Sequence, residues 1–444
     1  MRELFATLPD DPAPPMRDGY LDTVLTRGRR SARRRRIGTA AVWVLVVLAL
    51  AVAAVPFTQP LTRPGAPTRE PGLPDRFAGY STLTSTVAKA PAGRAIALYT
   101  YGNGELFNMF QPLVVGADRD TYRRVDAMQE RDLPSALLAP DGTLVLLGDN
   151  RGAISDLVLV DLGTGKRRSI PIDGPVGVRL LAWSPDGRYV AYSAATLTGS
   201  DGTVNFVDSE VARGGTLRLL DLTTGRSTEL AAGKPAWTAA FAPDSRRLAV
   251  QVGRTVHLLD LDGRESGTIK IRDDRELVAN VGWSPDGRFL ATVPWRGDGP
   301  SSGNTDLGEF LSNAGSVSFI PVADDGGPQP PAPVDGVVQV LGWRSASSLV
   351  AATTNDVGHL FLTEVPLRDG PRRTLSSFDT GSTCELGMQT CRVADLRLAT
   401  GLLSDATVRH ARGPQRGPWP AALTTPIAAV VLGAGLLLWR RTRR

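Results

Sequence analysis

A four-residue turn motif recurs along the middle of this chain and constrains its fold more than any other feature. Each copy lies between two short apolar runs. Proline sets φ at the second position of a turn, aspartate bonds its own backbone two residues on, and glycine accepts a left-handed conformation, so each copy predicts a tight hairpin. A hairpin that returns along the chain indicates a repeat architecture. The copies are Ser184-Pro185-Asp186-Gly187, Ser284-Pro285-Asp286-Gly287 and the weaker Ala139-Pro140-Asp141-Gly142 and Ala242-Pro243-Asp244-Ser245.

The best-preserved repeat contains four strand-length apolar runs. They cover residues 179–183, 188–192, 216–222 and 227–230, and turn residues bound each of them. A second reversal, such as Asp221-Leu222-Thr223-Thr224-Gly225, stands between the third run and the fourth. The sequence therefore predicts four-stranded units with a turn after the first strand and another after the third.

The spacing of the repeats predicts a β-propeller of four-stranded blades. The bulky residues two places before the turn proline, with Trp343 in a copy that lacks the proline, are separated by 45, 58, 42 and 60 residues. A propeller blade takes roughly 40–45 residues, and the two long intervals contain insertions rich in Gly, Ser, Asp and Asn, at 194–215 and 296–315. Residues 76–412 are enough for six or seven blades, of which we favour seven. An additional blade is expected from 94–125, and closing strands from 392–404. The bulky residues are Leu138, Trp183, Phe241, Trp283 and Trp343.

The repeated strand, Ser-Pro-Asp-Gly turn and second apolar strand resemble the TolB-type, WD-like propeller repeat. The resemblance covers residues 134–378, and two copies carry the full tetrapeptide. It implies the propeller fold. It implies no single activity, because propellers serve as binding scaffolds, lyases, hydrolase gates and dehydrogenases.

Two uncharged runs, at 37–57 and 419–439, are each long enough to cross the roughly 30 Å apolar core of a membrane as a helix. Arginines precede the first and follow the second, which predicts that both chain ends are cytoplasmic. The first run could also be a cleaved signal peptide. The predicted organisation is a basic cytoplasmic leader (1–36), a transmembrane helix (37–57), a Pro-rich stalk (58–75), an extracytoplasmic propeller (76–412), a linker (413–418), a transmembrane helix (419–439) and a basic cytoplasmic tail (440–444).

The positive charge of the chain is concentrated at its ends. The chain has 50 Lys and Arg against 45 Asp and Glu, but the leader and tail hold thirteen of the basic residues and only five of the acidic ones. The segment between them is therefore net acidic, at 37 against 40. This distribution is typical of a topology signal and argues against nucleic acid as a partner.

The residues that could carry chemistry are few. Cys384 and Cys391 are the two cysteines, and in an oxidising compartment they predict one disulfide across a short loop. The three histidines form no ligand pattern, no Gly-x-Ser-x-Gly elbow occurs, and the repeated aspartates are explained by their turns. No catalytic residue, cofactor or metal site is therefore expected.

The leading hypothesis is a non-enzymatic, membrane-anchored scaffold that binds a protein or a cell-envelope ligand. In four-stranded blades the loops between second and third strands lie opposite the Ser-Pro-Asp-Gly turns, so both insertions should share one face. It is equally expected that the two insertions are flexible loops with no binding role. A transmembrane sensor that signals through the leader is an alternative, as is an enzyme with its active site in the central channel. The candidate binding residues of the insertions are Asp201, Asn205, Phe206, Asp298, Asn304, Asp306 and Phe310.

Overall fold

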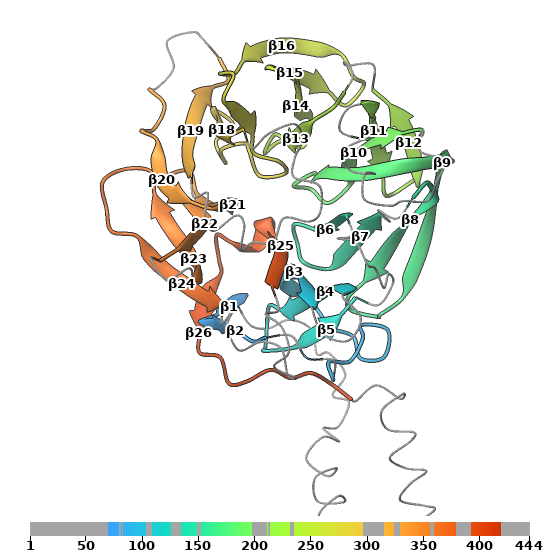
Figure 1. Ribbon diagram of the computed structural model, residues 1–444, viewed down its shortest axis with the longest axis vertical. Helices are drawn as coiled ribbons and strands as arrows, with labels where there is room; N and C mark the ends of the chain where they lie inside the picture. The colour runs from blue at the N-terminus through green and yellow to red at the C-terminus, as the bar shows by residue number, and fades with distance from the viewer. Residues whose placement is uncertain are drawn as a thin grey trace, which may run out of the picture. The chain divides into compact units, whose positions relative to one another are not determined.

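The computed structural model is an all-β arrangement of sheets placed around a centre, as in a propeller (Figure 1). Within the described residues the sheets have two, seven, four, four, five and four strands. The predicted all-β, propeller-like fold is therefore confirmed, whereas the predicted number of blades is not settled by this sheet count. The structure describes residues 70–79, 81, 83–103, 109–125, 135–148, 152–197, 211, 214–230, 235–295, 315–323, 329–355, 359–378 and 392–418.

Four sheets are built as blades, with antiparallel strands that pair in chain order. Two of them are formed wholly by consecutive strands, and in a third the strand β2 pairs in parallel with β24. In the fourth, the C-terminal strand β25 pairs with β3, which confirms the closing strand expected near residue 392. The sheets comprise β13 (Thr238–Phe241), β14 (Arg247–Val252), β15 (Thr255–Asp260) and β16 (Glu265–Lys270); β17 (Arg275–Leu277), β18 (Phe289–Pro294), β19 (Gly315–Pro321) and β20 (Val334–Val337); β21 (Gln339–Ser345), β22 (Ser348–Thr354), β23 (Leu360–Pro366), β24 (Arg373–Phe378) and β2 (Arg76–Phe77); and β25 (Arg392–Leu398), β3 (Ala95–Asn103), β4 (Met109–Gly116) and β5 (Tyr122–Arg124).

The seven-stranded sheet is held together by one long strand. β9 (Arg167–Trp183) pairs through its first residues with β8 (Ile154–Asp161) and through its last residues with β10 (Tyr189–Ala195). β8 pairs with residues 167–176 of β9 and β10 with residues 177–183, so the two parts of β9 take part in separate ladders. The other strands are β6 (Ser135–Leu138), β7 (Leu144–Gly148), β11 (Thr216–Asp221) and β12 (Arg226–Glu229).

The aspartates of the repeated motif hold the turns as the sequence predicts. The Asp186 carboxylate accepts a hydrogen bond from the Arg188 backbone N–H at 3.0 Å, and the Ser184 hydroxyl accepts one from the Tyr189 N–H at 2.8 Å. Gly187 has φ of 76°, the left-handed conformation that the motif requires. The same bond, from the N–H two residues on, is made by the equivalent aspartates Asp141, Asp244 and Asp286.

The core lies between neighbouring sheets, where the inward-facing residues of the strands meet. The bulky residues before the turns are part of it, with Trp183 only 2% and Trp283 only 4% exposed. The indole N–H of Trp283 donates to the Ala240 carbonyl, 43 residues earlier, at 2.9 Å. Each bulky residue therefore joins its hairpin to the core, and Trp283 also ties one sheet to the sheet before it.

The two ends of the described chain meet beside β5. β1 (Gly72–Pro74) pairs in parallel with β26 (Thr407–Arg409), which follows the short 3-10 helix η2 (Thr400–Leu402). The free edge of β5 is covered on the same side, because Tyr122 N–H donates to Gln415 and Arg124 N–H to Ser85. Capping of an edge strand in this way removes a site for unwanted pairing.

Within the described parts of residues 70–418, no helix has the length and apolar character needed to cross a membrane. The two predicted spans, 37–57 and 419–439, lie outside the described residues, and so do Cys384 and Cys391. The transmembrane helices, the disulfide and the extracytoplasmic location stay predictions.

Candidate functional site

The described stems of the two insertions form the first candidate site. The first insertion leaves the end of β10 and returns at β11, and the second leaves β18 and returns at β19. Both departures are at the sheet end opposite the Ser-Pro-Asp-Gly turns, because β10 and β18 each begin directly after a turn. We call this end of the two sheets and of the β13–β16 sheet between them, with Leu197, Val211, Trp237, Glu276 and Trp295, the insertion face.

The first stem is packed closely against the long strand β9. A Cβ atom on Gly177 would lie 2.5 Å from the side chain of Leu197 and 3.0 Å from that of Val211, so both residues rest on this glycine. Val211 is fully buried, and its carbonyl accepts a hydrogen bond from Gly215 N–H at 2.7 Å. The stem is therefore part of the packed structure on both sides of the insertion.

The second stem is pinned by a buried arginine. The Arg275 side chain, in a residue that is 8% exposed, donates to the Thr292 carbonyl at 2.6 Å and to the Ser316 carbonyl at 2.8 Å. Thr292 precedes the insertion and Ser316 follows it, so one guanidinium joins the two sides. Burial lowers the pKa of Arg275, because a desolvated cation is disfavoured.

Two tryptophans connect the stems. The rings of Trp237 and Trp295 are stacked, with centroids 4.6 Å apart and planes at 20°. Trp295 directly precedes the second insertion, and its N–H donates to the Asp274 carbonyl at 2.7 Å. Trp237 follows Ala236, whose N–H reaches the Gly215 carbonyl of the first stem at 3.4 Å. The stacked pair thus lies at the base of both insertions.

Charged groups surround this aromatic pair. The Trp237 indole N–H points to a Glu276 carboxylate oxygen at 3.5 Å, and the Arg179 guanidinium donates to the Trp237 carbonyl at 3.0 Å. Trp237 is 7% exposed, whereas Trp295 and Glu276 are half-buried. Flat apolar faces beside a carboxylate suit a ligand that offers an apolar surface together with hydroxyl or cationic groups.

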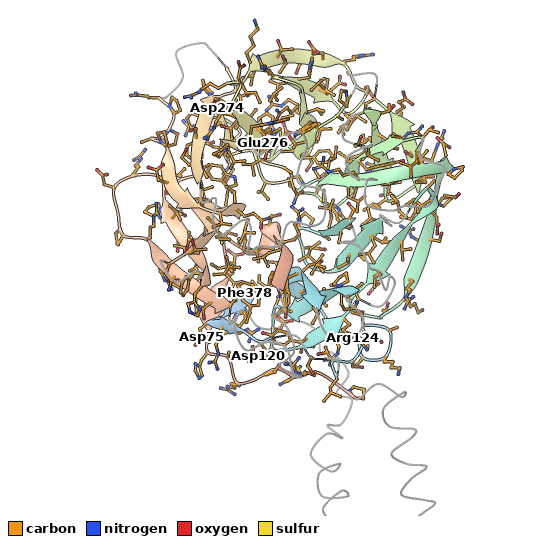
Figure 2. The ribbon with its side chains drawn as sticks, in the orientation of Figure 1. Asp75, Asp120, Arg124, Asp274, Glu276 and Phe378 are labelled. Atoms are coloured by element: carbon orange, nitrogen blue, oxygen red, sulfur yellow. The ribbon has the colours of Figure 1, made fainter. Side chains whose placement is uncertain are left out.

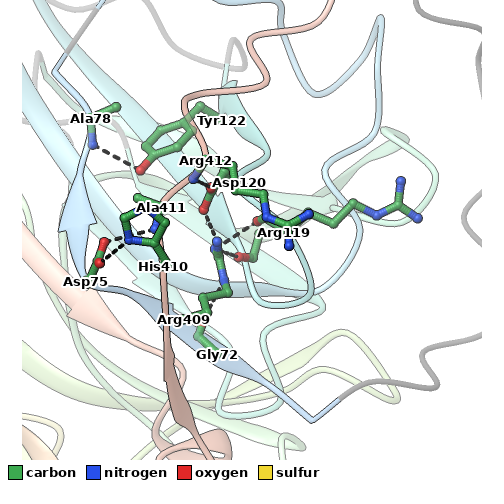
Figure 3. A network of polar contacts seen from close by, with 11 residues as sticks. Gly72, Asp75, Ala78, Arg119, Asp120, Tyr122, Arg409, His410, Ala411 and Arg412 are labelled. Atoms are coloured by element: carbon green, nitrogen blue, oxygen red, sulfur yellow. Dashed lines mark hydrogen bonds and ion pairs between the residues drawn. The ribbon is translucent and has the colours of Figure 1, made fainter.

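The second cluster of polar groups closes the ring (Figure 3). Arg409 forms an ion pair with Asp120, which is 5% exposed, and its guanidinium also donates to the Gly72 carbonyl at 3.2 Å and the Arg119 carbonyl at 2.9 Å. These contacts span up to 337 residues of sequence. We call Asp75, Asp120, Arg409, His410 and the backbone N–H of Arg412 the closure network.

Asp75 and Asp120 anchor the returning chain from two sides. Asp75 accepts hydrogen bonds from the Ala411 N–H at 2.9 Å and from the His410 ring at 2.8 Å, and Asp120 accepts one from the Arg412 N–H at 2.7 Å. Both hydrogen bonds hold the pKa of Asp75 below its ordinary value, and the bond from the Ala411 N–H makes the larger contribution. Burial raises the pKa of Tyr122, which accepts the Ala78 N–H at 3.0 Å, to about 12.

All seven predicted binding residues lie outside the described residues, so the structure does not place them. Sequence reasoning missed the groups that the structure does place at the insertion stems. Trp295 had a usable signal, since it is the last residue before an insertion. Trp237, Arg275 and Glu276 had none, because their partners belong to other strands. The seven are Asp201, Asn205, Phe206, Asp298, Asn304, Asp306 and Phe310.

Across the described residues, no three His, Cys, Asp or Glu side chains are grouped so as to hold a metal ion. The insertion face and the closure network contain carboxylates, guanidiniums and indoles, but no nucleophile paired with a base is described there. The arrangement at the stems can bind a surface by stacking and hydrogen bonding.

Comparison with known proteins gives a partial sequence match and distant structural neighbours. No model of a protein family matches this chain. A WD repeat-containing protein, SL1-17, of Schistosoma mansoni is 29% identical over 142 residues, which is 31% of this chain and 40% of that protein. The chain thus matches well under half the length of that curated relative.

Two solved structures illustrate the structural neighbours. TolB from Acinetobacter baumannii is 15% identical, with 71% of this chain and 67% of that one covered and a TM-score of 0.40. An oligogalacturonate lyase from Vibrio parahaemolyticus is 13% identical, with 71% and 81% covered and a TM-score of 0.41. Likeness at this level assigns no activity to the chain.

Proposed function

We propose that this chain is a non-enzymatic, membrane-anchored propeller on the extracytoplasmic side that binds a protein or cell-envelope ligand through its insertion face. The observation that carries the proposal is the stacked pair Trp237 and Trp295 at the base of both insertions. A stacked aromatic pair presents a rigid surface, and aromatic residues are enriched where proteins bind partners.

The stems support a binding role because they fix where each insertion begins and ends. Val211 and Gly215 hold the first stem, and Arg275 holds both sides of the second. A binding loop that starts from a rigid base loses less conformational entropy when it meets a ligand than a loop on a mobile base. The β13–β16 sheet separates the two bases, and Trp237, which directly precedes β13, links them through its stacking on Trp295.

We further propose that the propeller has six blades. The support comes from β9, whose first half belongs to the ladder of β6 to β8 and whose second half belongs to the ladder of β10 to β12. On this interpretation the seven-stranded sheet is two blades that share one continuous strand. Added to the four separate blades, these make six.

Replacement of both insertions tests the binding role. The variant carries short Gly-Ser linkers in place of 198–210 and 296–314, which keeps Leu197, Val211 and Ser316 in their packed positions. The control replaces 324–328, in the connection between β19 and β20 at the opposite sheet end, in the same way. Each full chain is expressed in cells, crosslinked and purified, and its thermal unfolding is measured.

The double replacement should lose its specific crosslinked partner while its melting temperature stays within a few degrees of the parent chain. The 324–328 control should retain the partner. Equal capture by both variants would contradict the binding role of the insertion face, and a large fall in melting temperature would make the insertions structural.

A reporter assay tests the membrane topology separately. Reporters that work only outside or only inside the membrane are fused after Phe378 and after Arg444. An outside signal at Phe378 with an inside signal at Arg444 is expected. An inside signal at Phe378 would refute the location, and the disulfide between Cys384 and Cys391 with it.

A further inference from the structure

A group of exposed arginines surrounds the closure network. Arg76 follows Asp75 in sequence, Arg119 precedes Asp120, and the backbone of Arg412 bonds to Asp120. All three arginines are exposed, and none of them forms an ion pair with another described residue. Figure 2 shows that Asp75, Asp120 and Arg124 lie on the side of the ring opposite Asp274 and Glu276. We call Arg76, Arg119 and Arg412 the basic patch.

The three acidic side chains next to the patch are already engaged. Asp120 is buried against Arg409, Asp75 is bonded to His410 and Ala411, and Asp118 pairs with Arg94 at 3.1 Å. The outward-facing charge of this region is therefore positive. Glu70 and Asp405, in the same segments, are exposed, so a ligand that meets this region encounters a net excess of cations rather than cations alone.

The charge of this region differs from that of the rest of the predicted exported segment. Residues 70–94, 116–125 and 405–418 together hold nine Lys and Arg against five Asp and Glu. The other residues of 37–439 hold 28 against 35. A local excess of positive charge on an otherwise acidic segment produces an attractive field for anions at one place only.

The chain stays attached to the propeller almost to the predicted second span. Gln415 N–H donates to the Asp120 carbonyl at 2.7 Å, and the Arg416 guanidinium donates to the Gly79 carbonyl and the Thr84 hydroxyl, both at 3.0 Å. Gly417 has φ of +75°, and a Cβ there would lie 2.9 Å from atoms of both Ser85 and Arg123. Ordered contacts thus continue five residues past the expected propeller boundary at Arg412.

This attachment limits how far the patch can lie from a membrane. The predicted span begins at Trp419, two residues after Gly417, and two extended residues reach about 7 Å. If that span crosses the membrane, as the proposed function requires, the residues around Gly417 lie at the headgroup level. Arginines at this distance interact with anionic headgroups within one Debye length.

We infer that the basic patch binds the phosphate groups of anionic phospholipids and so holds the closing side of the propeller against the bilayer. The three arginines belong to three separate segments that Asp75, Asp120 and Arg409 tie together, so their backbone positions are held close to one another. The turn end of the β25-β3-β4-β5 sheet, which carries Arg119, is opposite the end from which second strands lead to third strands.

The test measures lipid binding to the purified full chain in detergent, by native mass spectrometry with titrated phosphatidylglycerol or phosphatidylcholine. The variant is Arg76→Gln/Arg119→Gln/Arg412→Gln, which leaves every backbone bond of the closure network in place. The matched control is Arg226→Gln/Arg246→Gln/Arg264→Gln, which removes the same charge from exposed arginines in other sheets. The basic leader and tail are identical in all three chains, so their contribution cancels.

The basic-patch variant should lose about ten-fold of its preference for phosphatidylglycerol over phosphatidylcholine, and the control should keep it. Thermal unfolding of the variant should match that of the parent chain, because the closure network is intact. An equal preference in all three chains would overturn the inference. Displacement of the lipid by low millimolar inorganic phosphate would also overturn it, in favour of a site for a free anion.

The result of the lipid-binding test is independent of the insertion face, because neither triple arginine variant changes the stems of the insertions. If the patch fails and the reporter assay still gives an outside propeller, the proposed function stands without the lipid contact. If the reporter at Phe378 is inside, the proposed function fails whatever the lipid result.

Discussion

The insertion face and the closure network are both polar clusters at sheet ends, but they are built differently. At the insertion face, half-buried Trp295 and Glu276 border loops, and the stacked pair is the centre of the arrangement. In the closure network, a buried carboxylate and an arginine join segments about 290 residues apart. The first arrangement leaves the indole of Trp295 partly exposed beside an insertion, whereas the second uses its groups within the fold.

The comparison shows how charge can be used for two purposes in one molecule. Asp120 and Arg409 serve closure because water is excluded from their contact, where an unpaired charge is costly. Arg76 and Arg412, a few residues away, are exposed and therefore free to bind. Burial, rather than residue type, separates the structural charges from the functional ones.

The largest expected effect comes from breaking the buried ion pair. Arg409→Gln leaves Asp120 buried without its cation, so the full chain should lose about 3 kcal/mol of unfolding free energy, near the lower end for such pairs. Denaturant unfolding measures the loss. The matched control is Arg188→Gln, which removes the pair with Asp221, where half of the Arg188 side chain is exposed, and should cause no resolvable change. An equal loss of unfolding free energy in the two variants would contradict the distinction between the buried charges of the closure network and exposed charges.

A smaller loss is expected where the chain leaves the propeller. Gly417→Ala forces a side chain into a left-handed position that is also crowded by Arg123 and Ser85, at a cost of about 2–3 kcal/mol. Gly93→Ala is the control, since Gly93 has the same φ of +75° but a Cβ there would meet no other part of the described chain within 4 Å. It should lose only about 1 kcal/mol. If both variants unfold at the same denaturant concentration, the chain around Gly417 does not pack as described.

The turn chemistry explains why much of the fold could be predicted from sequence. Asp186 and Ser184 act on residues two to five places away, so their roles are visible in a short stretch of sequence. The copy at Trp343 shows the limit of that reasoning. It lacks Pro, Asp and Gly, yet β21 and β22 still pair, with Ser345 accepting the Ser347 N–H at 3.1 Å.

The closure network and the aromatic pair could not be predicted because their partners are distant in sequence. Nothing local distinguishes Arg409 from the many other arginines of the chain, and its partner Asp120 resembles any turn aspartate. Trp237 and Trp295 meet only because two sheets adjoin. The blade number was uncertain for a related reason, since β9 runs as one strand through the ladders of β8 and β10, which no turn motif indicates.

A further substitution tests the aromatic side of the comparison. Trp295→Leu keeps an apolar side chain but removes the stacking on Trp237, which contributes about 1 kcal/mol beyond area burial. We expect a small loss of stability together with a large loss of crosslinked partner. The control Trp343→Leu removes a half-buried indole that bonds the Val281 carbonyl away from the stems, and it should lose stability while it retains the partner. Equal partner capture by both variants would remove the aromatic pair from the binding surface.

The smallest expected effect concerns pH and the exposed part of the closure network. The folded pKa of Asp75 is lowered, so its contribution to stability is complete above the unfolded value of about 3.9 and is lost as pH falls through the folded value. Asp75→Asn should therefore flatten the dependence of stability on pH below about 4. The effect should be smaller than that of Arg409→Gln, because the Asp75 side chain is 41% exposed and its interactions are screened by solvent.

The control His410→Gln should keep most of the pH dependence of stability, since the Ala411 N–H is the larger cause of the lowered pKa of Asp75. If His410→Gln flattens the pH dependence of stability as much as Asp75→Asn does, the His410 ring and not the Ala411 N–H is the main cause of the lowered pKa of Asp75. The exposed side of the closure network is then held by the Asp75–His410 side-chain pair.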